Sequence, residues 1–262
     1  MTEARVRSGP LAGRVAIVTG VSRSIGIGWA IARRLGMDGA DLLLTGWRAH
    51  DEGWPWGPGD RPVGELADEL AAAGVRVEHE PADLSDPAVP AALVAKARER
   101  LGHVDVLVAN HARSDAQGIR QTTAEELDRQ WAVNVRATLL LVQAVAAQHD
   151  GRPGGRIVLM TSGQHLGAMP GEIGYVATKG AIQQVTRTLA AELAPGLTVN
   201  TVNPGATDTG YADAALREAV RAASPHGRWG QPEDAARLIA WLVSDEAAWI
   251  TGQTIDSNGG GE

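Results

Sequence analysis

Residues 15–28 read VAIVTGVSRSIGIG, in which an apolar run leads into a turn that contains three glycines. The run has the length and the β-branched content of a buried strand, and residues 28–37 have the apolar spacing of a helix. Glycines at a strand-to-helix turn let backbone N–H groups approach a pyrophosphate, and the helix N-terminus adds roughly half a positive charge there. The segment therefore predicts a dinucleotide-binding turn. A plain glycine turn is the alternative, because the spacing departs from G-x-G-x-x-G.

The rest of the chain repeats this strand-then-helix order. The apolar runs are unbroken rather than alternating, as expected for parallel strands that helices cover on both faces. We therefore predict an α/β fold, with one Rossmann-type domain over residues 1–262 and a doubly wound parallel sheet of about seven strands. The predicted strands are residues 15–19, 42–45, 75–78, 104–109, 156–160, 198–202 and 254–256, and the predicted helices are residues 28–37, 64–73, 87–101, 124–148, 174–193 and 232–243.

One segment interrupts this order. Residues 50–62 read HDEGWPWGPGDRP and are predicted to form an inserted loop, because glycine, proline and tryptophan dominate them. Trp54, Pro55 and Trp56 would expose a large apolar surface unless something covers it. A lid over a cofactor, a subunit contact and burial within the same chain all remain open explanations.

Composition excludes several classes of protein. The 262 residues, 44% of them hydrophobic, are enough for one sizeable core. A formal net charge of −7 and the lack of a basic stripe argue against nucleic-acid binding. The chain has no cysteine, which excludes disulfides and thiolate ligands, and we predict no metal site. Residues 1–10 lack a signal-peptide pattern and no run of about 18 apolar residues occurs, so we expect a cytoplasmic protein without a membrane segment.

The end of the second predicted strand bears on cofactor choice. An acidic residue there accepts hydrogen bonds from the ribose of NAD, but residues 44–48 read LTGWR and contain no carboxylate. Arg48 at this place, and Arg23 in the glycine turn, could instead pair with a 2′-phosphate. This favours NADP(H) over NAD(H), unless both arginines are merely solvated.

Tyr175 and Lys179 lie four residues apart in a predicted helix, and therefore on one helix face. An unperturbed tyrosine has a pKa of about 10, but a nearby ammonium favours the phenolate and lowers that pKa. The pair therefore predicts a tyrosine that exchanges protons near neutral pH. A Tyr-x-x-x-Lys pattern can also arise by chance.

Other motifs accompany this pair in a characteristic order. The chain resembles the short-chain dehydrogenase/reductase family from about residue 13 to residue 260. The glycine turn is two residues longer than that family's usual turn, and a histidine stands where the family usually has a small residue in the sequence after the fourth strand. The motifs that carry the resemblance are the turn from Thr19 and Gly20, Asp83, Ala109-Asn110-His111-Ala112, Asn134, Ser162, Tyr175 with Lys179, and Asn203-Pro204-Gly205.

The resemblance implies catalytic roles for four residues. Tyr175 would exchange the proton with the substrate oxygen, and Ser162 would hydrogen-bond that same oxygen. Lys179 would hold the nicotinamide ribose and lower the pKa of Tyr175. Asn134 would kink its helix and anchor a water that links Lys179 to solvent.

The resemblance also implies contacts with cofactor and substrate. We expect Asp83 and Leu84 to contact adenine, and residues 208–229 to form a substrate lid. His111 would contact the cofactor ribose or the substrate, or would be a structural or surface histidine. The expected cofactor-binding residues are Gly20, Ser22, Arg23, Ile27, Trp47, Arg48, Asp83, Leu84, Asn110, His111, Tyr175, Lys179, Pro204, Gly205, Thr207 and Thr209, and the expected substrate contacts are Gln164, His165 and Tyr211.

Together these patterns predict an NADP(H)-dependent oxidoreductase that acts on a small-molecule ketone or secondary alcohol, similar to the 3-oxoacyl-carrier-protein reductases. Reduction of a C=N or C=C bond on the same scaffold is one alternative, and a non-catalytic NADP(H)-sensing or scaffold protein is another. The resemblance also implies a homotetramer or a homodimer, because members of the family typically pair the helices predicted at residues 124–148 and 174–193 across subunits.

Overall fold

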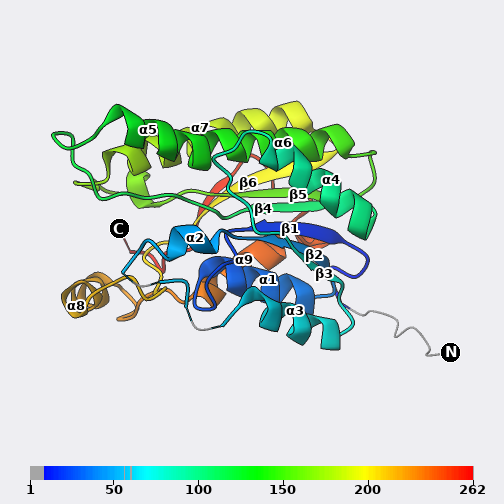
Figure 1. Cartoon of the computed structure of the whole chain (residues 1–262), viewed down its shortest axis with the longest axis horizontal. Helices are drawn as coiled ribbons and strands as arrows, with labels where there is room; N and C mark the ends of the chain where they lie inside the picture. Colours follow the sequence, from blue (N-terminus) through cyan, green and yellow to red (C-terminus); the bar gives the residue numbers. More distant parts are fainter. Residues whose placement is uncertain (1–8, 56, 60, 262) are drawn as a thin grey trace.

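The computed structural model describes residues 9–55, 57–59 and 61–261. Two regions discussed above lie outside the described residues. They are Trp56 of the predicted insertion and the first eight of residues 1–10, which lack a signal-peptide pattern. The chain folds around a parallel sheet of seven strands in the order β3-β2-β1-β4-β5-β6-β7 (Figure 1). The strands are β1 (Val15–Thr19), β2 (Asp41–Thr45), β3 (Val77–His79), β4 (Val106–Ala109), β5 (Gly155–Met160), β6 (Leu197–Asn203) and β7 (Thr254–Asp256).

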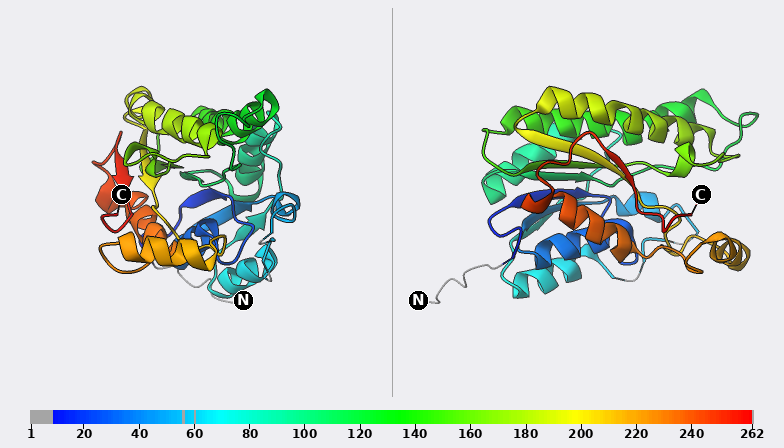
Figure 2. Two further views of the ribbon diagram at one scale, coloured as in Figure 1. Left: turned by 90° about the vertical axis from the view of Figure 1, so that its left-hand side faces the viewer. Right: turned by 180° about the vertical axis from the view of Figure 1, so that it is seen from behind.

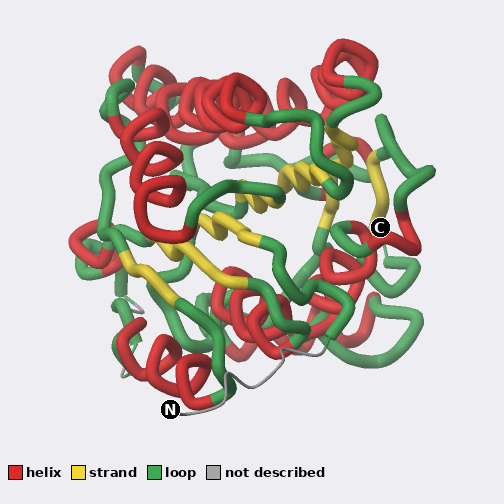
Figure 3. The backbone as a smooth tube through the Cα atoms, turned by 90° about the vertical axis from the view of Figure 1, so that its right-hand side faces the viewer, coloured by secondary structure: helices red, strands yellow, loops and turns green. Residues whose placement is uncertain are grey.

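Helices cover both faces of this sheet, as the unbroken apolar strands predict (Figure 3). Successive side chains of β1 point to opposite faces, so Ala16 and Val18 pack in one core while Val15 and Ile17 pack in the other. The first core includes α1 (Ile27–Met37), α3 (Val63–Ala72) and α9 (Pro232–Leu242), and the second includes α4 (Val89–Leu101), α6 (Ala137–Gln148) and α7 (Ile173–Leu193). The predicted doubly wound α/β fold is confirmed.

Two short helices lie apart from these layers. Helix α2 (Arg48–Asp51) begins two residues after β2, and its last two residues belong to the segment 50–62 that was predicted to be an inserted loop. Helix α8 (Ala214–Ala223) lies within residues 208–229, the segment predicted to be a substrate lid. Both lie toward the same end of the molecule, where α8 projects beyond the sheet (Figures 1 and 2).

The helix predicted over residues 124–148 is not continuous. It consists of α5 (Ala124–Trp131), a π-helical turn η1 (Ala132–Arg136) and α6. The Thr138 hydroxyl donates to the Asn134 carbonyl at 2.8 Å, and the Asn134 side chain bonds to a neighbouring loop. Such side-chain bonds draw backbone groups away from regular helix geometry, and π-turns of this kind often mark functional sites.

Other boundaries shift by one or two residues. Helix α4 starts at Val89 rather than at residue 87, because the carboxylates of Asp83 and Asp86 accept backbone N–H groups two residues on and form turns there. Strand β3 starts at Val77 rather than at residue 75, because the backbone N–H of Val75 bonds to the end of α3. No helix within the described ranges is both long enough and apolar enough to cross a membrane.

Candidate active site

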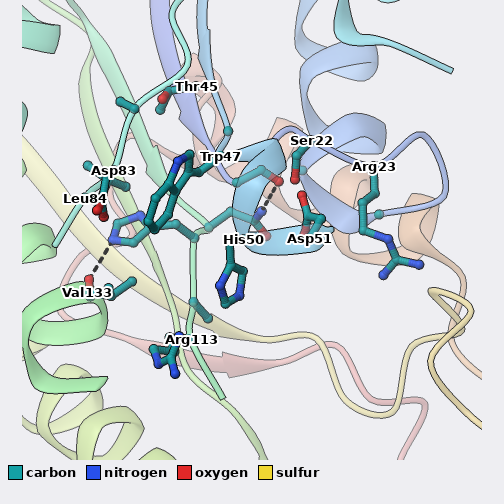
Figure 4. A pocket seen from close by; sticks show the side chains of 18 of the residues that line it. Ser22, Arg23, Thr45, Trp47, His50, Asp51, Asp83, Leu84, Arg113 and Val133 are labelled. Atoms are coloured by element: carbon teal, nitrogen blue, oxygen red, sulfur yellow. Dashed lines mark hydrogen bonds between the residues drawn. The ribbon is translucent and has the colours of Figure 1, made fainter. Parts of the chain in front are cut away.

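A cavity of about 530 Å³ opens at the carboxyl ends of β1, β2 and β4. The connections from β1 and β4 run in opposite directions there, which makes it the position where open α/β sheets bind their ligands. Its volume is within the usual range for small-molecule and cofactor sites. Ten of the predicted cofactor-binding residues line it: Gly20, Ser22, Arg23, Ile27, Trp47, Asp83, Leu84, Asn110, His111 and Thr209 (Figure 4).

Close backbone packing explains the glycines of the turn. A Cβ atom on Gly28 would lie 2.2 Å from the Gly20 carbonyl oxygen, which no side chain allows. Gly20 has φ +72°, and its own Cβ would lie 2.8 Å from Nδ2 of Asn110. That Asn110 amide donates to the carbonyls of Thr19 and Gly20 at 3.1 and 3.3 Å. The turn is therefore fixed against β4, even though it is longer than the family's usual turn.

His111 lines the cavity, but both of its ring nitrogens contact the protein. Nε2 donates to the Val133 carbonyl at 3.0 Å, and Nδ1 accepts from the Thr19 hydroxyl at 2.7 Å. Burial and, to a smaller extent, the charge of Lys179 lower the pKa of His111 to about 4. These contacts favour the structural alternative for the ring, which ties β1 to the π-helical turn η1.

Tyr175 and Lys179 share one face of α7, as their spacing predicts. The Lys179 Nζ atom lies 5.5 Å from the centroid of the Tyr175 ring. It donates to the carbonyl of Met160 at the end of β5 at 3.0 Å, and burial lowers the pKa of Lys179 to about 8. Ser162, two residues after Met160, hydrogen-bonds the phenol of Tyr175. The structure therefore brings Ser162, Tyr175 and Lys179 together.

The predicted acidity of Tyr175 is wrong for this arrangement. The pKa of Tyr175 is raised to about 12, because burial and the charges of Glu172 and Tyr211 outweigh the hydrogen bond from Ser162, which lowers it. The ammonium of Lys179 lies over the ring and donates to Met160, so it does not offset the loss of water around the phenol.

Asn134 connects three elements. Its Oδ1 accepts from the backbone N–H of Arg113 at 2.7 Å, and its Nδ2 donates to the Arg113 carbonyl at 2.8 Å and to the Thr178 hydroxyl at 2.9 Å. Asn134 is the central residue of the π-helical turn, where the helix departs from regular geometry. Arg113 also makes a bidentate ion pair with the buried Glu126 of α5, with both N···O distances at 2.8 Å.

Some expected cofactor contacts do not line the cavity. Arg48 is one of them: its Nε lies 3.4 Å from Glu52, one turn along, and its side chain is half exposed, so its pairing with a 2′-phosphate stays a prediction. Pro204, Gly205 and Thr207 form a tight loop after β6, in which the Thr207 hydroxyl donates to the Pro204 carbonyl at 3.2 Å. Tyr175 and Lys179 also lie outside the lining of this cavity.

Sequence reasoning missed several lining residues. Thr45 at the end of β2, and His50 and Asp51 on α2, all line the cavity. Proximity to the end of β2 was the available signal, because residues after that strand face the ribose in dinucleotide-binding folds. Arg113 and Arg129 also line it, and both lie within ion-pair distance of Glu126.

The three expected substrate contacts have different surroundings. Gln164 donates to the Thr161 hydroxyl and to Gln183, so its amide is bound within the protein. Nε2 of His165 lies 3.1 Å from the carboxylate of Asp256 of β7. Tyr211 is 44% exposed, and its ring lies 6.0 Å from that of Trp229. Only Tyr211, through its charge, acts on the pKa of Tyr175.

Comparisons with known proteins agree with this geometry. A family model described as "Enoyl-(Acyl carrier protein) reductase" matches residues 20–262. The uncharacterized oxidoreductase YjdA of Bacillus subtilis (strain 168) is 42% identical over 250 residues, which are 94% of this chain and 96% of the relative.

Two solved structures are also similar. One is the angucycline C-6 ketoreductase LanV with bound NADP, with a TM-score of 0.85, 34% identity and 97% of each chain covered. The other is a short-chain dehydrogenase from Burkholderia cenocepacia J2315 in complex with NADP, with a TM-score of 0.85, 34% identity, and 96% of this chain and 99% of that chain covered.

The fold and the cavity define a Rossmann-type α/β enzyme. The chain belongs to the short-chain dehydrogenase/reductase family of oxidoreductases.

Proposed function

We propose that this enzyme transfers a hydride between NADP(H) and a small-molecule ketone or secondary alcohol, with chemistry similar to that of the 3-oxoacyl-carrier-protein reductases. The observation that carries the proposal is the grouping of Ser162, Tyr175 and Lys179 at the end of β5, with Lys179 Nζ 5.5 Å from the Tyr175 ring. We infer that the enzyme is cytoplasmic and that residues 1–262 form a single catalytic domain.

The residues of the cavity fit a dinucleotide. Gly20 and its neighbours offer backbone N–H groups at the start of α1, and Arg23 offers a guanidinium that is partly buried. Two similar structures contain NADP, one of them in a ketoreductase. We propose the same cofactor here, held by the ten lining residues named above. When bound, its nicotinamide ring supplies or accepts the hydride.

Tyr175 acts as the proton donor in the reductive direction. Because burial raises its pKa to about 12, the phenol is protonated at neutral pH and can donate to a carbonyl oxygen that gains negative charge. Ser162, which hydrogen-bonds the phenol, stabilises the same oxygen. Lys179 keeps its ammonium next to the ring. Asn134 holds the π-helical turn η1 against Thr178 of α7.

The test is consumption of NADPH and of NADH with a panel of ketones. We expect NADPH to be consumed faster with at least one ketone. Tyr175→Phe should lower kcat about 10²- to 10⁴-fold, as expected for loss of a general acid, while NADPH binding changes by less than about twofold. Normal turnover in that variant would refute the proposed role of Tyr175.

A second candidate reaction is reduction of a C=C bond. The description of the matching family model, an enoyl reductase, is the observation that favours it. Ketone reduction needs Ser162 at the carbonyl oxygen, whereas hydride addition to a C=C bond relaxes that need. Ser162→Ala should therefore abolish most turnover with ketones. Retained turnover with enoyl or imine substrates would shift the assignment to them.

We also propose a homotetramer or homodimer. Trp131 and Leu127 are 50% and 40% exposed on α5, one of the helices that the family resemblance pairs across subunits, and a partner there would cover them. Light scattering of the purified enzyme measures the oligomeric mass, and a monomer at micromolar concentration would contradict this proposal.

A further inference from the structure

The lining of the cavity contains three buried polar atoms without a hydrogen-bond partner in the described part of the chain. They are Nε of Arg23, Oγ1 of Thr45 and Oδ2 of Asp51. All three residues line the cavity, and they come from the glycine turn, the end of β2 and helix α2. Buried polar atoms are nearly always paired in native structures, so a donor, a hydroxyl and an acceptor grouped around one cavity indicate a polar ligand.

Asp51 is the acceptor of this group. Its side chain lies next to Ser22, on the side of the cavity to which Arg23 belongs (Figure 4). Its negative charge acts on both Arg23 and His50, and raises the pKa of each against the effect of burial. The carboxylate is therefore close to a guanidinium, but it leaves one oxygen unbonded toward the cavity.

Aromatic contacts hold α2 in this position. The ring of His50 stacks on that of Trp47, with centroids 6.4 Å apart and planes inclined by 15°. Nε1 of Trp54 donates to Nε2 of His50 at 3.2 Å, so the residues after α2 bond back to the helix. Asp51 is thus carried by a supported element rather than by a free loop.

In dinucleotide-binding folds, the residues after the second strand contact the ribose next to adenine. We therefore expect this ribose to lie near Asp51. A carboxylate accepts hydrogen bonds from ribose hydroxyls and repels a 2′-phosphate, whereas a guanidinium attracts the phosphate. The other two arginines that line the cavity, Arg113 and Arg129, both interact with Glu126. Arg23 is therefore the lining arginine that does not pair with Glu126, and Asp51 is the carboxylate whose charge acts on it.

We propose that Asp51 is a specificity-determining residue of the cofactor site. It accepts a hydrogen bond from a ribose hydroxyl of NAD(H) and opposes the attraction of Arg23 for the 2′-phosphate of NADP(H). The enzyme consequently binds both dinucleotides, with a preference for NADP(H) that Asp51 moderates. This inference rests on the proposed function, because it concerns the same cofactor site.

The experiment compares dissociation constants for NADPH and NADH in the full-length protein, measured by isothermal titration calorimetry. Asp51→Asn removes the charge and keeps the shape, so we expect NADPH to bind about tenfold more tightly and NADH to bind more weakly. Arg23→Gln should act in the opposite direction and weaken NADPH. Thermal unfolding without ligand verifies that both variants are folded, and Asp51→Ser replaces Asp51→Asn if that variant is not.

Glu52→Gln is the matched control. It removes the same charge one residue further on, where the side chain is exposed and faces Arg48 outside the cavity. The ratio of the two dissociation constants should then stay within about twofold of wild type. Equal effects of Asp51→Asn and Glu52→Gln on that ratio would refute the inference and leave the proposed function standing. A wild-type protein that binds neither dinucleotide would overturn both.

Discussion

The phenol of Tyr175 is subject to opposing effects. The hydrogen bond from Ser162 lowers its pKa, whereas burial and the charges of Glu172 and Tyr211 raise it. Glu172 is the residue immediately before α7, and burial raises its own pKa as well. The enzyme thus holds a carboxyl group beside the acid that we propose for catalysis, and that group favours the protonated phenol.

We therefore predict that Glu172→Gln moves the pH dependence of alcohol oxidation toward lower pH. Oxidation needs the phenolate, and removal of the carboxylate lowers the pKa of Tyr175, so the phenolate forms at lower pH. The measurement is log(kcat/KM) against pH with NADP⁺ and a secondary alcohol. Glu192→Gln, on the same helix, is the control and should leave the profile unchanged. A shift of the Glu172→Gln profile toward higher pH would contradict the prediction.

His111 links protein stability to pH. Its pKa is lowered from 6.5 to about 4 in the folded protein, so below pH 6.5 the unfolded chain binds a proton that the folded chain does not. The stability that the neutral ring contributes is therefore present above pH 6.5 and is lost as the pH falls toward 4. The expected loss is about 3 kcal/mol in the free energy of unfolding. Urea denaturation at several pH values measures it, and His111→Ala should lack this component. Parallel pH curves for the two proteins would disprove the prediction.

At the scale of elements, Arg113 connects the loop after β4 to both α5 and η1. The backbone of Arg113 bonds to the Asn134 side chain, while its guanidinium pairs with Glu126. Glu126 is 5% exposed, so its pairing is largely shielded from water. Any change that frees Arg113 should therefore also loosen Asn134 and the kink.

Glu126→Gln tests this connection. We expect a loss of about 2 kcal/mol in the free energy of unfolding, because a partly buried guanidinium loses its carboxylate. We also expect a lower kcat, because the contact between Asn134 and Thr178 depends on the same loop. Urea denaturation and steady-state kinetics measure the two effects. Glu125→Gln, an exposed neighbour in the same first turn, should have little effect on either. A stable variant with reduced kcat would show that the loop acts only on catalysis.

The elements also show what sequence can and cannot predict. The five inner strands of the sheet were expected because a buried parallel strand needs an unbroken apolar run, whereas the edge strands β3 and β7 are only partly buried. Tyr175 and Lys179 were expected to share a helix face because residues four apart in a helix lie on the same side of it. The directions of Arg48 and Asp51 could not be predicted, since ring contacts among Trp47, His50 and Trp54 orient α2. The bond from Lys179 to Met160 likewise depends on how α7 packs against β5.

At the scale of the whole molecule, the cavity is lined by elements from both of the helix layers that cover the sheet. Its lining combines the start of α1 from one layer with Val133 of η1 and Arg129 of α5 from the other. A ligand in this cavity would therefore stabilise both layers together, and local opening at either side would be coupled to its release.

We predict that NADPH at about 100 times its dissociation constant adds about 2.7 kcal/mol to the free energy of unfolding. For a chain of 262 residues this corresponds to a rise in Tm of roughly 5–8 °C, in a single transition. Thermal unfolding followed by circular dichroism, with NADPH, NADH, adenosine 2′,5′-bisphosphate or no ligand, measures the shift. The bisphosphate fragment occupies only the adenosine half, so its smaller shift separates the contribution of Arg23 and Asp51 from that of the nicotinamide side. Two transitions, of which only one responds to NADPH, would contradict a cavity shared by both layers, because each layer would then unfold independently of the other.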